Sequence, residues 1–518
     1  MSEPFYITTA ISYPNGRPHI GHAYEAIATD AIARFQRLKG REVFFLTGTD
    51  EHGLKMAQAA RERGIEPAQF ADEMSSTFKA MDDALNISYD RFIRTTAPDH
   101  LRASQAIWQA MAERGDIYLG RYEGWYSVRD EAYYDEEELH TADSGEKLSP
   151  QGTPVDWTVE ESWFFKLSAY QVKLLAHYEA NPSFIRPDSR RNEVLRFVEG
   201  GLSDLSISRT SFDWGVKVPG SPDHVMYVWL DALTNYLTGV GYPDNTYNYR
   251  TFWPADIHII GKDVVRFHAV YWPAFLMSAG IPLPKQVFGH GFLLNRGEKM
   301  SKSVGNVVDP IELASLYGVD PLRYFLLRDV SFGQDGTYSD EAIVTRANAD
   351  LSNSFGNLAQ RTLSFIAKNC GGVLPYGGRE DDADGQLLAT VQHAVATEVP
   401  REFEELRLSQ GIEAWLRAVF ACNQYIDAQA PWALRKSDPE RMTAVLATLC
   451  VAIMDLAIAI QPVIPTSAAK LLDQLGVPAD GRTFAALHDP DRYARLAASG
   501  PIQPPEPIFP RLALPAEE

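Results

Sequence analysis

The N-terminal part of the chain alternates short apolar runs with helical patterns, and this alternation restricts the fold more than any other feature. Residues 5–10 (FYITTA) form an apolar run typical of a strand, a turn follows at 14–16, and a helical pattern covers 20–38. A second strand pattern at 43–47 is followed by a second helical pattern. Strands separated by helices form parallel sheets, so the alternation predicts an α/β fold with a doubly wound, Rossmann-like parallel sheet.

The alternation stops over residues 116–225 and then resumes. That stretch is rich in tyrosine, tryptophan, acidic residues and turn formers, which indicates an inserted connective domain. Strand patterns return at 226–230 and 256–260, and a helical pattern at 264–279 follows the second of them. Long helical patterns then predict a C-terminal all-α helical bundle, and they cover 341–368, 386–405, 410–428 and 442–460. The proline-rich tail after residue 500 should lie extended over the surface.

Composition and net charge restrict which partners the chain can bind and in which compartment it can fold. The net charge of −20 argues against broad electrostatic binding of nucleic acid, so any RNA contact should be confined to one face. Three cysteines far apart provide neither a disulfide framework nor a Cys-x-x-Cys metal site, which fits a reducing cytoplasm. The N-terminus lacks the pattern of a signal peptide. The apolar stretch 445–460 contains Asp455 and is followed by Pro462, which predicts a buried bundle helix and not a membrane span.

Two histidines follow the first predicted strand, in the segment PNGRPHIGH at 14–22. His19 and His22 stand three residues apart at the start of a helix, so both rings can face one way. A helix N-terminus offers N–H groups and a partial positive charge, and imidazole donors beside it suit a nucleotide triphosphate. Gly21 would let the nucleotide approach the backbone closely. Histidine pairs are common on protein surfaces, so this motif alone does not distinguish a nucleotide site from two histidines without a functional role. A zinc site would need further ligands nearby.

A lysine motif, KMSKS at 299–303, follows a strand pattern at 287–294 and a turn that contains Gly297. We expect it on a mobile loop, where Lys299 and Lys302 can swing in and neutralise the charge that builds on a leaving pyrophosphate. A solvated basic loop is the alternative for such a short segment.

Together, the histidine motif after the first strand, the KMSKS motif after a late strand and the helical C-terminal half resemble the class I aminoacyl-tRNA synthetases. The resemblance implies that His19 and His22 hold the ATP phosphates and stabilise the transition state of adenylate formation, while Lys299 and Lys302 bind the triphosphate. It implies ATP as the Mg²⁺ complex and an ATP site that also includes Gly21, Glu25, Gly261, Asp263, Met300, Ser301 and Ser303.

Two further segments are similar to the methionyl-tRNA synthetases: VWLDA at 228–232 with Tyr236, and GKDVVRFH at 261–268. On a helix, Val264, Phe267 and His268 share one face. Such an aromatic wall suits a thioether, because sulfur packs well against ring edges, although an aromatic stripe at helical spacing is more often core.

The resemblance implies a methionine site with a carboxylate beside the aromatic wall. The lining residues would be Ala10, Ile11, Tyr13, Trp229, Ala232, Tyr236, Val264 and His268. Asp50 would take the ammonium group, since it ends an apolar strand at the edge where parallel sheets bind ligands. An isolated carboxylate there can equally cap the next helix.

In the helical half, NLAQR at 357–361 and QAPW at 429–432 resemble anticodon-reading positions of the same family. Asn357 and Arg361 would hydrogen-bond base edges and Trp432 would stack on an unpaired base, which is the usual chemistry for RNA loops. A tryptophan in a bundle is more often core. The implied partners are methionine, ATP and the initiator and elongator tRNAs for methionine.

The chain departs from many relatives in two respects. Residues 124–131 and those that follow contain no cysteine where relatives carry zinc knuckles, so we expect no structural zinc. The appended oligonucleotide-binding barrel that dimerises some relatives is missing, which favours a monomer. The expected domains are the two halves of the nucleotide-binding catalytic domain at 1–115 and 226–292, the connective domain at 116–225, a region with the mobile loop and a tRNA-stem contact at 293–340, and a helical anticodon-binding domain with an extended tail at 341–518.

Three rival functions are weaker. Sister enzymes for leucine, isoleucine or valine carry a longer editing insertion, and a cysteine enzyme should show zinc ligands. A small adenylyltransferase would not need the helical half. A non-catalytic tRNA-binding protein would not need His19, His22, Lys299 and Lys302. The sequence therefore favours an enzyme that attaches methionine to tRNA through a methionyl-adenylate.

Overall fold

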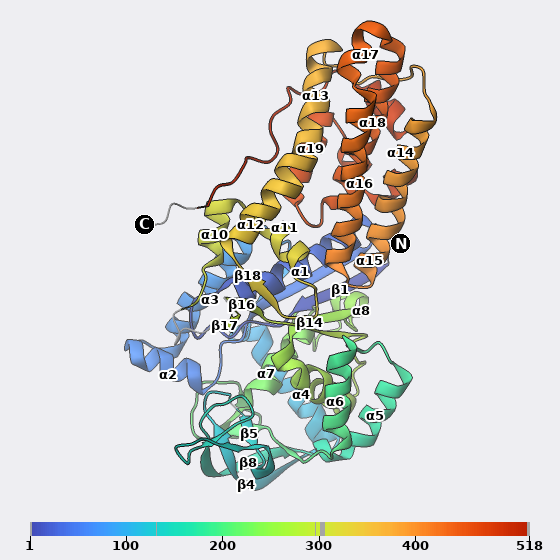
Figure 1. Ribbon diagram of the computed structural model, residues 1–518. Helices are drawn as coiled ribbons and strands as arrows, with labels where there is room; N and C mark the ends of the chain where they lie inside the picture. Colours follow the sequence, from blue (N-terminus) through green and yellow to red (C-terminus); the bar gives the residue numbers. More distant parts are fainter. Residues whose placement is uncertain (1–2, 131, 296, 301–305, 515–518) are drawn as a thin grey trace.

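The computed structural model describes residues 3–130, 132–295, 297–300 and 306–514. Figure 1 shows a helical half at one end of the molecule, a parallel sheet in the middle, and a smaller antiparallel part at the opposite end. The predicted fold class, a doubly wound α/β core with a C-terminal helical bundle, is confirmed.

A six-stranded parallel sheet forms the centre of the N-terminal half. Its order is β3 (Arg91–Arg94), β2 (Glu42–Thr49), β1 (Pro4–Thr9), β14 (Ile257–Gly261), β15 (Val287–His290) and β9 (Ile185–Arg186). The strand order reverses between β1 and β14, and ligands of such sheets bind outside the carboxyl ends of the strands at this point. The edge strand β9 comes from within 116–225, so part of the stretch expected as an insertion rejoins the sheet.

Helix α1 (Ile20–Leu38) connects β1 to β2 and is buried along most of its length. Its apolar side chains face the sheet on one side and helix α11 (Val319–Asp329) on the other. The remaining helices of this half are α2 (Leu54–Arg63), α3 (Pro67–Ala84), α4 (Pro98–Glu113), α7 (Val228–Thr238), α8 (Tyr247–Phe252), α9 (Trp272–Ala279) and α10 (Pro310–Tyr317).

The strand predicted at 226–230 is wrong. Strand β13 (Ser221–Met226) ends at Met226, and helix α7 begins at Val228. The two alternatives look alike in sequence because the apolar run 226–230 crosses from the end of β13 into the first turn of α7, and five residues are too few to show a helical period.

The helix predicted at 264–279 is interrupted. A π-helical turn spans Phe267–Tyr271, and α9 starts only at Trp272. Pro273 has no N–H to donate to the carbonyl of Ala269 four residues earlier, and the Tyr178 hydroxyl donates to that carbonyl instead, at 2.6 Å. The turn shifts the side chains that follow it around the helix axis relative to a regular helix.

The antiparallel part is built on two long strands, β4 (Ile117–Ser127) and β8 (Asp156–Phe165). Its further strands are β5 (Ala132–Tyr134), β6 (His140–Thr141), β7 (Lys147–Leu148) and β10 (Leu205–Ser206), and helices α5 (Gln171–Ala180) and α6 (Asp188–Glu199) lie beside it. Strands β11 (Ser208–Arg209) and β12 (Lys217–Val218) pair with β13 and lead back to α7. A small sheet of β16 (Leu293–Asn295), β17 (Glu298–Lys299) and β18 (Gly336–Tyr338) follows the main one.

The helical half packs around α18 (Pro439–Ile460). Among the described residues, α18 is the one helix long and apolar enough to cross a membrane, and 83% of its most apolar stretch is buried inside the bundle. The predicted buried bundle helix is therefore confirmed. The other α-helices of this half are α12 (Asp340–Arg346), α13 (Asn357–Asn369), α14 (Asp382–His393), α15 (Val399–Glu404), α16 (Leu408–Gln429), α17 (Pro431–Ser437), α19 (Pro465–Leu475) and α20 (Arg492–Ala497). The tail lies extended as predicted, with hydrogen bonds such as Leu512 N–H to Asn348 Oδ1 at 2.8 Å.

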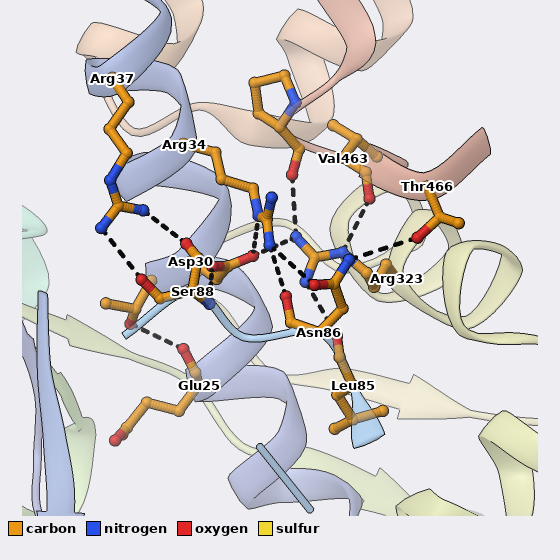
Figure 2. A network of polar contacts seen from close by, with 12 residues as sticks. Glu25, Asp30, Arg34, Arg37, Leu85, Asn86, Ser88, Arg323, Val463 and Thr466 are labelled. Atoms are coloured by element: carbon orange, nitrogen blue, oxygen red, sulfur yellow. Dashed lines mark hydrogen bonds and ion pairs between the residues drawn. The ribbon is translucent and has the colours of Figure 1, made fainter. Parts of the chain in front are cut away.

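A buried polar network joins the two halves (Figure 2). Asp30 of α1 and Arg323 of α11 are both fully buried and form an ion pair at 2.6 Å. The Arg323 guanidinium also donates to the carbonyls of Pro462 and Val463, in the turn between α18 and α19. Asp30 accepts further hydrogen bonds from Arg34 and Ser88. One carboxylate therefore ties helix α1 to the end of the central bundle helix.

Candidate active site

The N-terminus of α1 fixes the orientation of both motif histidines. His19 is the N-cap, and its Nδ1 accepts from the Gly21 N–H at 3.0 Å, while Nδ1 of His22 accepts from the His19 N–H at 3.1 Å. The two rings lie 3.9 Å apart between centroids. Because each Nδ1 accepts a backbone hydrogen bond, the proton of each neutral ring is on Nε2, and both rings present an N–H donor. This arrangement suits an anionic ligand at the helix end.

Gly21 is required here for a reason that the sequence did not suggest. A Cβ at this position would lie 2.9 Å from His19 Nδ1, so any side chain would push the ring out of its place. The glycine therefore holds the imidazole geometry, whatever it does for a nucleotide.

Glu25, expected at the ATP site, pairs with His290 at 2.7 Å in this structure. Burial raises the pKa of the Glu25 carboxyl. Burial alone would lower the pKa of His290, but its hydrogen bond to Glu25 outweighs this and the pKa is raised. His290 Nδ1 donates to the Gly291 carbonyl at 2.8 Å, so its ring is held on both sides. His290 was not among the predicted residues.

Four predicted methionine-site residues meet in one aromatic wall. Trp229 stacks on Phe267 with centroids 3.8 Å apart and meets His268 edge to face at 6.1 Å. His268 Nδ1 donates to the Val264 carbonyl at 2.9 Å, which leaves Nε2 to accept from the Tyr236 hydroxyl at 2.7 Å. Burial lowers the pKa of His268 to about 4, so the ring is neutral near pH 7. The wall is therefore uncharged and mostly apolar.

The other predicted residues lie at the carboxyl ends of the central strands. Ala10 follows β1 and donates its N–H to the Ile259 carbonyl of β14 at 2.9 Å, and Asp50 follows β2 and is buried. Ile11 and Tyr13 pack against the same hydrophobic cluster as Trp229 and Val264, and Ala232 is buried on α7. The expected sheet edge thus gathers the carboxylate and the aromatic wall.

Gly261 ends strand β14 at the same edge, and Asp263 lies in the short 3-10 turn that follows it. A Cβ on Gly261 would lie 2.8 Å from Asp263 Oδ1, so the glycine makes room for this carboxylate. Asp263 also acts electrostatically on Glu25 and His290, which places these three groups near one another.

The lysine motif is described only in part. Lys299 ends the short strand β17, and the Met300 side chain is buried in the cluster that contains the α1 residues. Ser301, Lys302 and Ser303 lie outside the described residues. A cavity of about 1370 Å³ extends from Asp130 of the antiparallel part to Asp263, Phe267 and Met300, so it opens beside the aromatic wall.

In the helical half, the three predicted anticodon residues lie on α13 and α17. Trp432 is 48% exposed, which argues against a core role. The Arg361 guanidinium lies over the Trp432 ring at 5.2 Å and pairs with Asp427 at 2.7 Å. Asn357 is exposed at the start of the same helix as Arg361. Arg361 and Trp432 are brought together across a sequence separation that no local pattern predicts.

Comparison with known proteins identifies the family. A family profile described as "tRNA synthetases class I (M)" matches residues 5–363, and one described as "Anticodon binding domain of methionyl tRNA ligase" matches residues 374–514. The chain belongs to the class I methionyl-tRNA synthetases. The methionine–tRNA ligase of Brucella suis biovar 1 is 59% identical and that of Rhizobium meliloti 58%, with 98% and 99% of each pair of chains covered.

Solved structures of methionyl-tRNA synthetases agree with this membership. The Mycobacterium tuberculosis enzyme in complex with methionyl-adenylate has a TM-score of 0.94 at 57% identity, covering 98% of this chain and 100% of that one. The free-state form of the same enzyme has a TM-score of 0.88 at 53% identity, with 99% of each chain covered.

Two buried carboxylates close to the predicted site residues, Glu51 and Asp231, were not predicted from the sequence. Glu51 receives a two-point contact from Arg94, at 2.7 and 2.9 Å, and Asp231 lies between His52 and His100. A signal was available for Glu51 and His52, since both follow Asp50 directly at a strand end. The partner histidine His100 comes from a distant helix and had no such signal.

Proposed function

We propose that the sheet edge described above activates methionine with ATP and that the helical half selects the tRNA. In the methionyl-tRNA synthetases this reaction attaches methionine to tRNA through a methionyl-adenylate, with release of pyrophosphate and AMP. The assignment is supported by two features at the switch point between the neighbouring strands β1 and β14: two oriented imidazole donors on the helix that follows β1, and an uncharged aromatic wall that includes His268 from the segment after β14.

For ATP, we assign the phosphates to the Nε2–H groups of His19 and His22. The methionine carboxylate attacks the α-phosphorus in line, and pyrophosphate leaves. Charge builds on the phosphate oxygens, and donors already held by backbone hydrogen bonds stabilise it without reorganising. Lys299 and Lys302 would neutralise the pyrophosphate, Mg²⁺ would accompany the nucleotide, and the ribose would lie near Gly261 and Asp263.

We assign the methionine ammonium to Asp50 and the thioether to the wall formed by Trp229, Tyr236 and His268. A neutral His268 supports this assignment, because an imidazolium would need solvent or a counter-ion where the thioether should lie. Sulfur packs favourably against ring edges, so the wall distinguishes a thioether from a polar side chain.

For tRNA, we assign anticodon contacts to Asn357, Arg361 and Trp432, for both initiator and elongator tRNA. The exposed indole beneath a guanidinium supports this, since both groups stack on unpaired bases. The domain boundaries given above remain part of this proposal, as do a monomeric state and a cytoplasmic location.

A hydroxyl cluster supports the proposal that the antiparallel part folds without structural zinc. Asp130 Oδ2 accepts from Ser149 at 2.5 Å, Thr153 at 2.6 Å and Tyr134 at 2.9 Å, and Ser127 joins Thr153 at 2.6 Å. The cluster ties the turn after β4 to the segment before β8, and its hydroxyl donors satisfy one carboxylate, a set unlike the thiolates that hold zinc.

Amino-acid-dependent exchange of pyrophosphate into ATP tests the function. We expect exchange with methionine and an at least 100-fold lower kcat/KM with leucine, valine or cysteine. A chain that exchanges better with another amino acid would be a sister enzyme, and one that binds tRNA without any exchange would be a non-catalytic module.

A further inference from the structure

Asp231 joins two histidines from different parts of the fold inside the core of the catalytic half. Its Oδ2 lies 2.6 Å from His52 Nδ1, and its Oδ1 lies 2.7 Å from His100 Nε2. All three side chains are buried, and Asp231 and His100 are fully so. Because a carboxylate only accepts, each histidine donates to it from the nitrogen named.

The three residues lie on three different segments of the catalytic half. His52 lies in the segment 49–53 that follows β2 and contains Asp50. Asp231 lies on α7, together with Trp229, Ala232 and Tyr236. His100 lies on α4, where its other nitrogen is 3.0 Å from the Thr238 hydroxyl at the end of α7. The contact between His52 and Asp231 therefore links the segment of the proposed ammonium site to the helix of the proposed thioether site.

The segment 49–53 is also held from its other side. Glu51 accepts from Arg94 at 2.7 and 2.9 Å and from Thr96 at 2.5 Å, and the Trp214 indole donates to its carbonyl at 2.7 Å. Asp50 is thus followed directly by two buried residues, Glu51 and His52, and the side chain of each is held by a partner from another segment. Of these two anchors, only the one at His52 reaches the helix that carries the aromatic wall.

The two histidines determine the charge state of the Asp231 carboxyl group. Burial alone would raise the pKa of Asp231, but His52 and His100 outweigh it and lower the pKa to about 2. The carboxylate is therefore ionised throughout the neutral range, and its hydrogen bonds to both rings are charge-assisted and strong. Such a contact fixes distance better than packing alone.

We propose that Asp231, acting through His52, is a positioning residue that sets the separation between the Asp50 carboxylate and the aromatic wall on α7. The inference rests on the proposed methionine site. In this arrangement the contact between His52 and Asp231 controls how well the enzyme binds an amino acid of methionine's length. It does not affect binding of the ATP phosphates, which are assigned to the α1 histidines. Misplacement of a binding group by about 1 Å can cost about 100-fold, so a loosened link should be measurable.

The test is methionine-dependent pyrophosphate exchange by the full chain, with KM measured separately for methionine and ATP. His52→Leu removes the donor, and we expect the methionine KM to rise about 10-fold or more with the ATP KM within about twofold. His52→Asn keeps an N–H at the position of Nδ1, and it should restore most of the methionine KM.

His100→Leu is the matched control, since it removes an equally buried donor from the same carboxylate but does not touch the Asp50 segment. We expect it to lower the thermal midpoint without the selective rise in methionine KM. An equal rise in both leucine variants, or no rise in His52→Leu, overturns the positioning role.

Should His52→Leu not fold, Asp231→Asn keeps the side-chain shape and weakens the link, and a methionine KM raised about threefold or more is then expected. An unchanged methionine KM in that variant overturns the inference. Failure of the proposed function looks different, because the wild-type chain itself would then show no methionine-dependent exchange.

Discussion

Replacing Arg323 with methionine tests how strongly the catalytic helix is tied to the bundle. The substitution removes the guanidinium that pairs with Asp30 at 2.6 Å and donates to three backbone carbonyls, of Leu85, Pro462 and Val463. Burial alone would raise the pKa of Asp30, but Arg323 and Arg34 outweigh it and hold the pKa below its usual value. The variant therefore leaves a buried charge with one cation fewer.

The magnitude follows from this geometry. Removing one partner of a fully buried ion pair typically costs about 3–5 kcal/mol, and a methionine side chain of similar length fills much of the space, so little is added for a cavity. Arg34→Met is the matched control: it removes a cation from the same carboxylate, but its side chain is 21% exposed, and we expect a loss of about 1 kcal/mol.

The two halves need not unfold together, so a single melting point is a poor measure. Hydrogen exchange followed by mass spectrometry reports local opening, and α1 and the turn at 461–464 are the segments to follow. We expect the free energy of opening there to fall by about 3–5 kcal/mol in Arg323→Met. A loss no greater than that of Arg34→Met would show that the interface is held by apolar packing and would refute the reasoning.

Three further predictions concern the site and the anticodon end. Burial lowers the pKa of His268 from its usual 6.5 to about 4, so between these pH values His268 is protonated in the unfolded chain and neutral in the folded chain. The free energy of unfolding should therefore fall by about 3 kcal/mol as the pH drops from 6.5 to 4. Urea unfolding of His268→Gln should lack this part of the pH dependence. Lys302→Ala should slow single-turnover adenylate formation at least 100-fold while methionine binding, followed by calorimetry, stays within about threefold; equal losses would remove the loop from the mechanism. Trp432→Ala should raise the KM for tRNA about 10-fold or more and leave tRNA-independent exchange unchanged, because stacking on a base is worth about 1–3 kcal/mol; a parallel loss of exchange would mean that the indole is structural.

The fold could be predicted from the sequence where the local pattern and the burial of the residues agree. β1, α1 and β2 were predicted nearly to the residue, because apolar strand runs, a turn and a helical pattern each leave a local signal. The start of α7 was mistaken for a strand, since the apolar run 226–230 begins in β13 and is too short to show a helical period. The π-helical turn before α9 depends on Pro273 and on a hydroxyl from Tyr178, a residue nearly a hundred positions away, so no window of sequence contains its cause.

The residues of the candidate site also divide into those with a local sequence signal and those without one. His19, Trp229 and His268 stand in local motifs; Trp229 and His268 contact each other, and His19 lies at the start of the helix that follows the neighbouring strand β1. The buried contacts that hold them come from distant segments: Asp30 meets Arg323, Glu25 meets His290, and His52 meets Asp231. Residue types alone cannot pair such groups, because pairing is decided by how whole elements pack.

The most direct measurement for this account is a crystal structure of the chain with a non-hydrolysable analogue of methionyl-adenylate. We expect the thioether against the rings of Trp229, Tyr236 and His268, the ammonium within 3.2 Å of an Asp50 oxygen, and the imidazoles of His19 and His22 directed at the phosphate position. An analogue bound elsewhere, with its methionyl group remote from that wall or its phosphate position remote from the two imidazoles, would contradict the account.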